Sequence, residues 1–381
     1  MKLTEDVLSY IDAHSGEALE LLMKLAQIPA PSHMEHKRAE FCKNWLQKQG
    51  AEGVYIDDAL NVVYPIHCNS DKPICVFMAH SDVVFPDTTP LPLSVSDGKI
   101  FCSGVGDDTA NVVLLLMCAK FIAQRKIMPI DHGILLVVNS CEEGLGNLKG
   151  CRKIMDTYST KIAEFITFDG SHNKIVNRAV GSQRDLVEVH TEGGHSYGDF
   201  GKRNAIATLA SMINKLYAIE IPAVGKTTFN VDTIAGGTSV NTIAQNAQML
   251  FEFRSDEKEG LKAMEHQFQA VIDEYRNCDI DITVTLLGNR PCGYVQNEIQ
   301  NKLMKRAAEA VQDHFGLEPQ FCSGSTDCNI PLSMGIAALC VGCVETYGAH
   351  TREEYVLIDS LKPGLGVAFQ LIMPLFNEYS A

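Results

Sequence analysis

Short apolar runs of strand length alternate with helical patterns over the first 170 residues, and this alternation restricts the fold more than any other feature. Residues 73–79 are apolar without interruption, as in a strand whose sheet is covered on both faces. A helical pattern follows Asp108, and strand patterns recur at residues 132–139 and 162–168. Strands that are separated by helices predict an α/β fold with a mostly parallel central sheet.

The pattern changes near Gln183. From there it predicts a strand, a helix, two strands, a helix and a strand, at residues 184–192, 204–217, 227–234, 247–255, 257–275 and 281–287. This is the βαββαβ order of ferredoxin-like domains. A chain of 381 residues is longer than one hydrophobic core usually supports. We therefore expect an α/β domain formed by residues 1–182 and 291–381, interrupted by an inserted ferredoxin-like domain at residues 183–290.

The composition restricts the kinds of partner that the protein can bind and indicates its cellular compartment. A net charge of −15 and a pI near 5.2 argue against nucleic acid or an anionic membrane as a partner. The acidic start lacks the apolar segment of a signal peptide, and the apolar runs are far shorter than the roughly 20 residues of a spanning helix. Thirteen cysteines fit reduced thiols rather than a disulfide framework, so we expect a cytoplasmic protein. The pair Cys340 and Cys343 lies in an apolar stretch, which favours a buried strand over a redox or zinc motif.

Two adjacent carboxylates, Asp107 and Asp108, follow a glycine-rich approach that begins at Gly104 and precede an apolar helical run. Taken alone, they predict only a helix N-cap. Further polar groups, however, also come after apolar stretches: His80, Glu142, Glu143, Asp169 and His350. Ligands bind at the carboxyl ends of strands in such sheets, so we interpret these residues as one site.

Imidazole and carboxylate ligands without a thiolate suit zinc, manganese or cobalt in an open catalytic centre. Two metals about 3.5 to 4 Å apart need a bridging carboxylate, for which we choose Asp107. Asp82 is two residues from His80, so both lie on one side of an extended segment and Asp82 can fix the imidazole tautomer. Of Glu142 and Glu143, one can bind metal while the other acts as general base.

A competing motif is the G-x-G-x-x-x-G sequence at residues 144–150, which follows a strand as a dinucleotide-binding loop would. The two glutamates immediately before it would repel a pyrophosphate. We therefore set an oxidoreductase function aside.

The ordered motifs resemble the M20 family of dinuclear zinc peptidases, most nearly its peptidase T-like tripeptidases and aminopeptidases. The resemblance covers essentially the whole chain, including the opening at residues 28–32. It implies two zinc ions per subunit, with Mn²⁺ or Co²⁺ as alternatives. By the resemblance, one zinc is held by His80 and Asp169 and the other by Glu143 and His350, with Asp107 as the bridge. Glu142 is then the general base and Asp82 the orienting carboxylate.

The inserted domain carries His195 in a Gly-Gly-His-Ser motif that is similar to the family's lid-domain histidine motif. The resemblance implies that His195 binds substrate, often across a homodimer, and that Asn241 and Arg254 contact a carboxylate or carbonyl of the substrate. A simple turn at His195 and a surface strand charge at Arg254 are the alternatives. The chain departs from many family members at residues 109–111, where Thr-Ala-Asn replaces the usual lysine and glycine.

The resemblance also implies the reaction. In this family an aspartate at the position of Asp169 accompanies aminopeptidases, which predicts hydrolysis of di- or tripeptides from a free amino terminus. The alternatives within the family are an N-acyl amino acid amidohydrolase and a carboxypeptidase. An alternative of another class is a noncatalytic module that binds metal or peptide, although such a module would not need Glu142.

Overall fold

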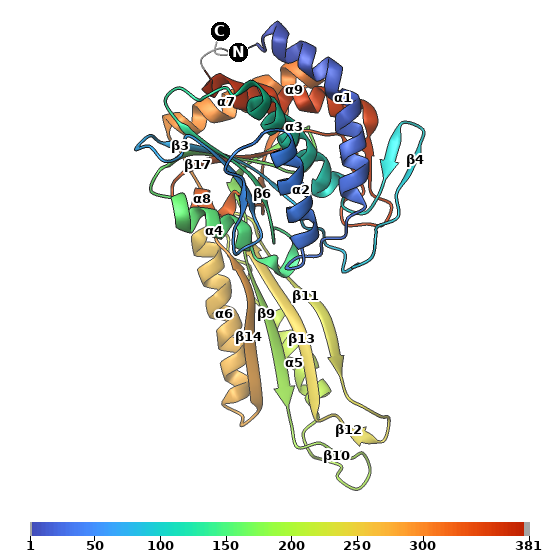
Figure 1. Ribbon diagram of the computed structural model, residues 1–381. Helices are drawn as coiled ribbons and strands as arrows, with labels where there is room; N and C mark the ends of the chain where they lie inside the picture. Colours follow the sequence, from blue (N-terminus) through green and yellow to red (C-terminus); the bar gives the residue numbers. More distant parts are fainter. Residues whose placement is uncertain (1, 377–381) are drawn as a thin grey trace. The chain divides into compact units, whose positions relative to one another are not determined.

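The computed structural model describes residues 2–376, which form two compact units (Figure 1). The first unit comprises residues 2–179 and 294–376, and the second is Val180–Gly293. Each unit has its own hydrophobic core. Within the described residues, no helix is both long enough and apolar enough to cross a membrane.

The first unit is built around a sheet of nine strands in the order β1-β2-β6-β3-β7-β17-β8-β15, with β16 beside β8. The strands β6, β3, β7 and β17 are neighbours and run parallel. The prediction of an α/β fold with a mostly parallel central sheet is therefore confirmed. The strands are β1 (Tyr55–Ile56), β2 (Val62–Ile66), β3 (Ile74–His80), β6 (Gly133–Asn139), β7 (Ile162–Phe168), β8 (Lys174–Ala179), β15 (Gly293–Tyr294), β16 (Gln320–Gly324) and β17 (Ala337–Val341).

The uninterrupted apolar sequence of β3 is explained by packing on both faces of the sheet. Phe77 and Ala79 belong to one core cluster, whereas Val76 and Met78 belong to another. The first cluster includes residues of α1, α3 and α9, and the second includes residues of α4 and α8. The helices of this unit are α1 (Glu5–Ala26), α2 (His36–Lys48), α3 (Ala110–Arg125), α4 (Lys149–Tyr158), α7 (Glu298–Phe315), α8 (Asn329–Ser333) and α9 (Leu361–Ile372).

A second, smaller sheet in this unit is made of very short strands. Its order is β18-β19-β5-β4. The strands are β4 (Ser94–Ser96), β5 (Lys99–Phe101), β18 (Thr346–Tyr347) and β19 (Tyr355–Leu357). The pairing of β19 with β5 brings the segment that follows His350 next to the segment that precedes Asp107.

The second unit has a four-stranded antiparallel sheet in the order β11-β13-β9-β14. Alternate strand residues such as Val187, Met249 and Phe251 form a core with side chains of two helices. The elements are β9 (Gly181–His190), α5 (Ala205–Leu216), β11 (Thr227–Gly236), β13 (Asn246–Ser255), α6 (Lys258–Arg276) and β14 (Asp281–Arg290), with β10 (Gly194–His195) paired to β12 (Thr242–Ile243). Leaving aside this small pair, the element order is the βαββαβ order of a ferredoxin-like unit.

Candidate active site

Polar side chains follow three neighbouring strands at one edge of the central sheet. His80 is the last residue of β3, and Asp169 directly follows β7. Glu142 and Glu143 come just after β6, whose last residue lies opposite His80 in the sheet. Because these strands are parallel, their carboxyl ends meet at this edge. The local sequence thus positions four candidate residues at or just beyond the ends of buried strands.

The Asp107 carboxylate lies between two histidines. Its Oδ1 is 3.1 Å from His80 Nε2, and its Oδ2 is 3.1 Å from His350 Nε2. Asp169 Oδ1 lies 4.0 Å from His80 Nε2, and Glu143 Oε1 lies 3.3 Å from His350 Nε2. The structure therefore brings all five predicted metal ligands into one cluster. Asp107 is shared between a His80 and Asp169 side and a His350 and Glu143 side.

The neighbouring Asp108 is buried, and both of its carboxylate oxygens already accept hydrogen bonds. The His80 backbone N–H donates to Oδ2 at 3.0 Å, and the Asn111 side-chain amide donates to Oδ1 at 2.6 Å. Asp108 also lies close to His80 and Asp169, within reach of a shared ion. Through these hydrogen bonds, Asp108 connects the His80 backbone with the Asn111 side chain.

Asp82 connects His80 to the glutamate turn. Its carboxylate accepts hydrogen bonds from the backbone N–H groups of Glu142 and Glu143, both at 2.9 Å, and from the Ser32 hydroxyl at 2.6 Å. His80 Nδ1 lies 3.1 Å from the Asp82 carbonyl oxygen and 3.4 Å from Oδ1 of its carboxylate. The imidazole is therefore oriented mainly by the backbone carbonyl of Asp82, with the carboxylate behind it.

The cluster holds more negative charge than its own residues balance. Burial, and then the charges of Asp107 and Glu142, raise the pKa of Glu143 to about 7 against the opposing effect of His350. Burial and the same neighbouring carboxylates raise the pKa of Asp169 well above its usual range. At Asp107, burial acts to raise the pKa, but hydrogen bonds from His350 and His80 outweigh it and lower the pKa below its usual range. A cation would relieve this repulsion.

The donor set fits divalent metal ions. Glu143 Oε1 is buried and accepts no hydrogen bond, although His350 Nε2 is 3.3 Å away, so it is available as a ligand atom. Nε2 atoms and carboxylate oxygens without a thiolate are typical of zinc, manganese or cobalt centres with an open position. The side chain of His350 is 59% exposed, which leaves the cluster open to solvent on that side.

Glu354, which the sequence analysis did not identify, holds the turn that carries Asp107. Its buried carboxylate accepts hydrogen bonds from the backbone N–H groups of Gly104 at 2.7 Å, Gly106 at 2.7 Å and Asp107 at 2.8 Å. Since Glu354 comes four residues after His350, one carboxylate links two ligand segments that are far apart in the sequence. No local pattern marks this role.

Asn111 and Arg38 also support the cluster. The Asn111 amide donates to Asp108, lies 3.3 Å from the Gly170 carbonyl oxygen, and accepts from the Cys343 backbone N–H at 3.0 Å. The fully buried Arg38 guanidinium donates to the Ser81 carbonyl and to the Thr109 hydroxyl. The residues Thr109 and Asn111, which the sequence analysis noted only as a departure from the usual lysine and glycine, thus have specific polar partners. Arg38 gave no signal in the sequence.

In the second unit, the loops of His195 and Asn241 lie side by side. His195 pairs with Thr242 through β10 and β12, and the Ser196 backbone N–H donates to the Asn241 carbonyl at 2.9 Å. His195 is exposed, and its Nδ1 accepts from the backbone N–H groups of Tyr197 and Gly198. The two glycine-flanked motifs therefore form one structural feature.

Arg254 lies elsewhere in this unit. It is near the end of β13, where it faces Ser182, and roughly 26 Å of strand separates it from Asn246 at the other end. Its guanidinium forms an ion pair with Glu252 at 2.6 Å. The structure of the second unit therefore does not bring Arg254 together with His195 and Asn241.

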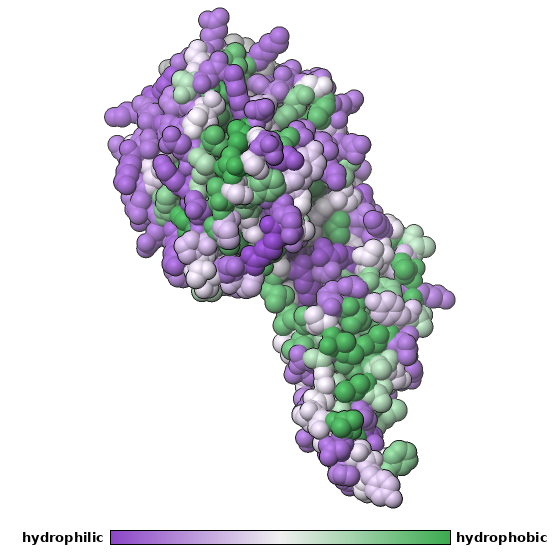
Figure 2. All heavy atoms as spheres, turned by 90° about the vertical axis from the view of Figure 1, so that its right-hand side faces the viewer, coloured by the Kyte–Doolittle hydropathy of each residue, from purple (hydrophilic) through white to green (hydrophobic). Residues whose placement is uncertain are grey.

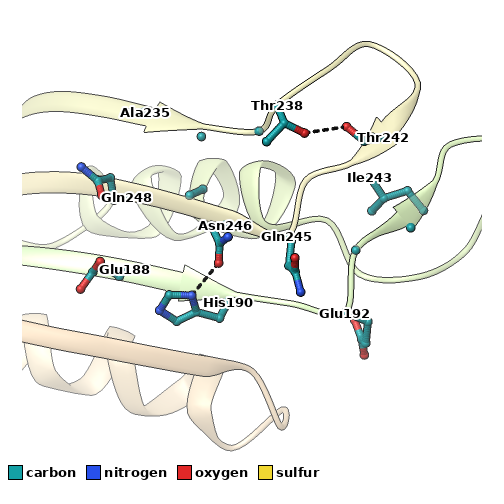
Figure 3. Close-up of a pocket in the computed structure, with 15 residues that line it drawn as sticks. Glu188, His190, Glu192, Ala235, Thr238, Thr242, Ile243, Gln245, Asn246 and Gln248 are labelled. Carbon is teal, nitrogen blue, oxygen red and sulfur yellow. Dashed lines mark hydrogen bonds between the residues drawn. The ribbon is translucent and has the colours of Figure 1, made fainter.

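A pocket of about 540 Å³ opens beside the glycine motifs of the second unit (Figure 3). Its lining includes Gly193, Gly237 and Thr238, and on the sheet Glu188 and His190. His190 Nδ1 is 2.8 Å from the Asn246 side-chain oxygen. Within the described residues, no group of three or more candidate metal ligands lies in this pocket.

Comparison of the sequence with known proteins gives a family and distant relatives. The sequence model of peptidase family M20/M25/M40 matches residues 76–373. Succinyl-diaminopimelate desuccinylase of Corynebacterium glutamicum is 24% identical over 356 residues, which cover 91% of this chain and 93% of that protein.

Solved structures share the fold. A tripeptidase from Staphylococcus aureus superposes with a TM-score of 0.74 at 21% identity, covering 95% of this chain and 98% of that one. The aminopeptidase PepT from Bacillus cereus gives a TM-score of 0.69 at 20% identity, with the same coverage.

Proposed function

Because the chain belongs to peptidase family M20/M25/M40, we propose that it is a two-metal aminopeptidase that hydrolyses di- and tripeptides from a free amino terminus. The observation that carries the proposal is the Asp107 carboxylate, which offers one oxygen to the His80 side and the other to the His350 side of a single cluster. Asp169 on the His80 side and the fold shared with tripeptidases support peptides as the substrate.

His80, Asp169, Asp107, Glu143 and His350 would hold the two metal ions, for which we propose zinc. Divalent ions at such a site polarise a peptide carbonyl and lower the pKa of an attacking water. The resemblance assigns Glu142 as the residue that takes the proton from this water and delivers it to the leaving amine. Asp82 fixes the Glu142 backbone N–H, and thereby the direction from which Glu142 acts.

The main alternative is removal of an acyl group from an N-blocked amino acid, which is favoured by the similarity to a desuccinylase. The two functions are separated by measuring amine release from trialanine and from N-acetyl-trialanine with the zinc-loaded enzyme. Cleavage of the free peptide alone supports the aminopeptidase. Cleavage of the blocked peptide alone would assign the amidohydrolase.

We further propose that two copies pair through the second unit. β11 is the edge strand of the four-stranded sheet, and its neighbourhood exposes Ile206 and Ile234. Figure 2 shows hydrophobic side chains gathered on the side of this unit that carries β11. An exposed edge strand with apolar neighbours favours pairing with another strand. Ile234→Asp should then shift sedimentation from dimer to monomer.

The thirteen free thiols support a cytoplasmic location.

A further inference from the structure

Asp327 is a buried carboxyl that the proposed reaction does not use. It lies just before α8 and is 1% exposed. Its Oδ2 accepts a hydrogen bond from the Asn139 side-chain amide at 2.7 Å. Within the described part of the chain, Asp327 Oδ1 and Asn139 Oδ1 are both buried and have no hydrogen-bond partner. The pair therefore has two buried acceptor oxygens and no donor for either of them.

A charged carboxylate in this position would be poorly compensated. A buried charge with a single hydrogen bond is costly unless a counter-charge or further donors stabilise it. The charged and titratable groups that face Asp327 are Glu142, His80, Asp82 and the thiols of Cys151 and Cys328. Glu142 and Asp82 are negative, so they add repulsion.

We propose that Asp327 carries a proton in the folded enzyme and pairs with the Asn139 amide, so that it fixes the end of β6 and the turn that carries Glu142. Asp327 is then a positioning residue that acts through Asn139 and Glu142. The inference rests on the proposed role of Glu142 as the general base.

The need for a proton does not depend on which way the Asn139 amide points. In the orientation described, two oxygens lack a donor. With the amide turned over, its oxygen would lie 2.7 Å from Asp327 Oδ2, and two acceptors at that distance require a hydrogen between them. A proton on Asp327 removes the uncompensated charge in the first arrangement and supplies the missing hydrogen in the second.

The charge balance of the site points the same way. Seven other carboxyl groups lie in the cluster and its immediate support: Asp82, Asp107, Asp108, Glu142, Glu143, Asp169 and Glu354. Two divalent ions and the buried Arg38 guanidinium would bring five positive charges, so seven ionised carboxylates would already outweigh them. Burial and the charge of Glu142 raise the pKa of Asp327 to about 8. When two neighbouring carboxyl groups cannot both ionise, one stays neutral and the other does the chemistry.

The test compares Asp327→Ala with Asp327→Asn in the full-length, zinc-loaded enzyme. The alanine variant should lower kcat/KM for trialanine by about tenfold or more, as loss of an orienting partner does. The asparagine variant is a neutral isostere that can donate to Asn139 Oδ1, so it should restore kcat/KM to within about threefold of wild type. A loss of about 100-fold or failure to fold in Asp327→Asn would overturn the proposal.

Two further readouts detect the proton itself. The infrared difference between wild type and Asp327→Asn should show the carbonyl band of a protonated carboxylic acid, and a carboxylate band instead would overturn the proposal. The folded state keeps its proton up to about pH 8, whereas the unfolded chain loses it near pH 4. The wild-type thermal midpoint should therefore fall relative to that of Asp327→Asn between these pH values, and an unchanged difference would contradict the inference.

Failure of this inference can be told apart from failure of the proposed function. If Glu142→Gln kept the wild-type turnover, Glu142 would not be the general base, whatever the protonation state of Asp327. If Glu142→Gln and Asp327→Asn were both inactive, only the proposal that Asp327 is protonated would be overturned.

Discussion

Replacing Glu354 by alanine should loosen the turn that carries Asp107. The Glu354 side chain is fully buried and accepts three backbone hydrogen bonds of 2.7 to 2.8 Å, from Gly104, Gly106 and Asp107. Alanine removes all three acceptors at once. The turn then carries three buried N–H groups without a partner unless water enters the space that is left.

The magnitude follows from these contacts. Each buried donor that loses its partner costs about 1 to 3 kcal/mol. Water that enters the space recovers part of this, so we take the low end of the range, about 3 kcal/mol in the free energy of unfolding of the first unit. Glu354→Gln should cost less, because its amide oxygen still accepts from two of the three donors.

Urea unfolding followed by the fluorescence of Trp45 measures this change, since Trp45 is the one tryptophan of the chain and packs against the core of the first unit. Chelator is kept in all samples, because bound metal would add stability of its own. Glu353→Ala is the matched control, since it removes the same charge from an exposed neighbour. If Glu354→Ala unfolds within about 0.5 kcal/mol of this control, the account of the turn is wrong.

Three further predictions concern the cluster and the second unit. Asp107→Asn should lower kcat/KM by more than about 100-fold, which exceeds the usual effect of losing a residue that only contacts a metal ligand. It should also reduce the metal retained after dialysis, and full retention of metal would exclude Asp107 as the bridging ligand. The nearby carboxylates of Asp107 and Glu143 raise the pKa of His350 to about 10, so zinc binding should release a proton and weaken as pH falls. Calorimetry in buffers of different ionisation enthalpy measures this, and no proton release would contradict it. His195→Ala should lower kcat/KM by about 100-fold with no change in thermal midpoint, because His195 is exposed; unchanged kinetics would remove it from the site.

Elements with a strong pattern could be predicted from the sequence. The uninterrupted apolar run of β3 and the helical pattern after Asp108, which is α3, fall where the sequence placed them. The sequence analysis did not predict α9, because Pro363, Gly364 and Gly366 are poor helix formers and interrupt its helical pattern. The structure explains both glycines: a Cβ on Gly364 would lie 2.1 Å from the Cys343 carbonyl oxygen, and a Cβ on Gly366 would lie 2.3 Å from His314 Nδ1. The strands of the smaller sheet have only two or three residues, which is too short to show the two-residue alternation of a β-strand.

The candidate ligands could be predicted because each follows a recognisable strand or glycine turn. The residues that support these ligands could not be predicted from the sequence. Glu354 contacts Asp107 across 247 positions of sequence, and Asp327 contacts Asn139 across 188. Such pairs form only when the sheet assembles, and a single buried carboxyl has no periodicity to reveal it. The arrangement of His195, Asn241 and Arg254 likewise depends on strand register, which places only the first two together.

The most direct test of a metal-dependent peptidase with Glu142 as its base compares wild type with Glu142→Gln, both stripped with chelator and reloaded with zinc. Trialanine hydrolysis and bound metal are measured on the same samples. The account predicts equal metal content, activity restored by zinc in wild type, and a loss of at least about 100-fold in the variant. A variant that binds zinc normally and hydrolyses trialanine at the wild-type rate would contradict it.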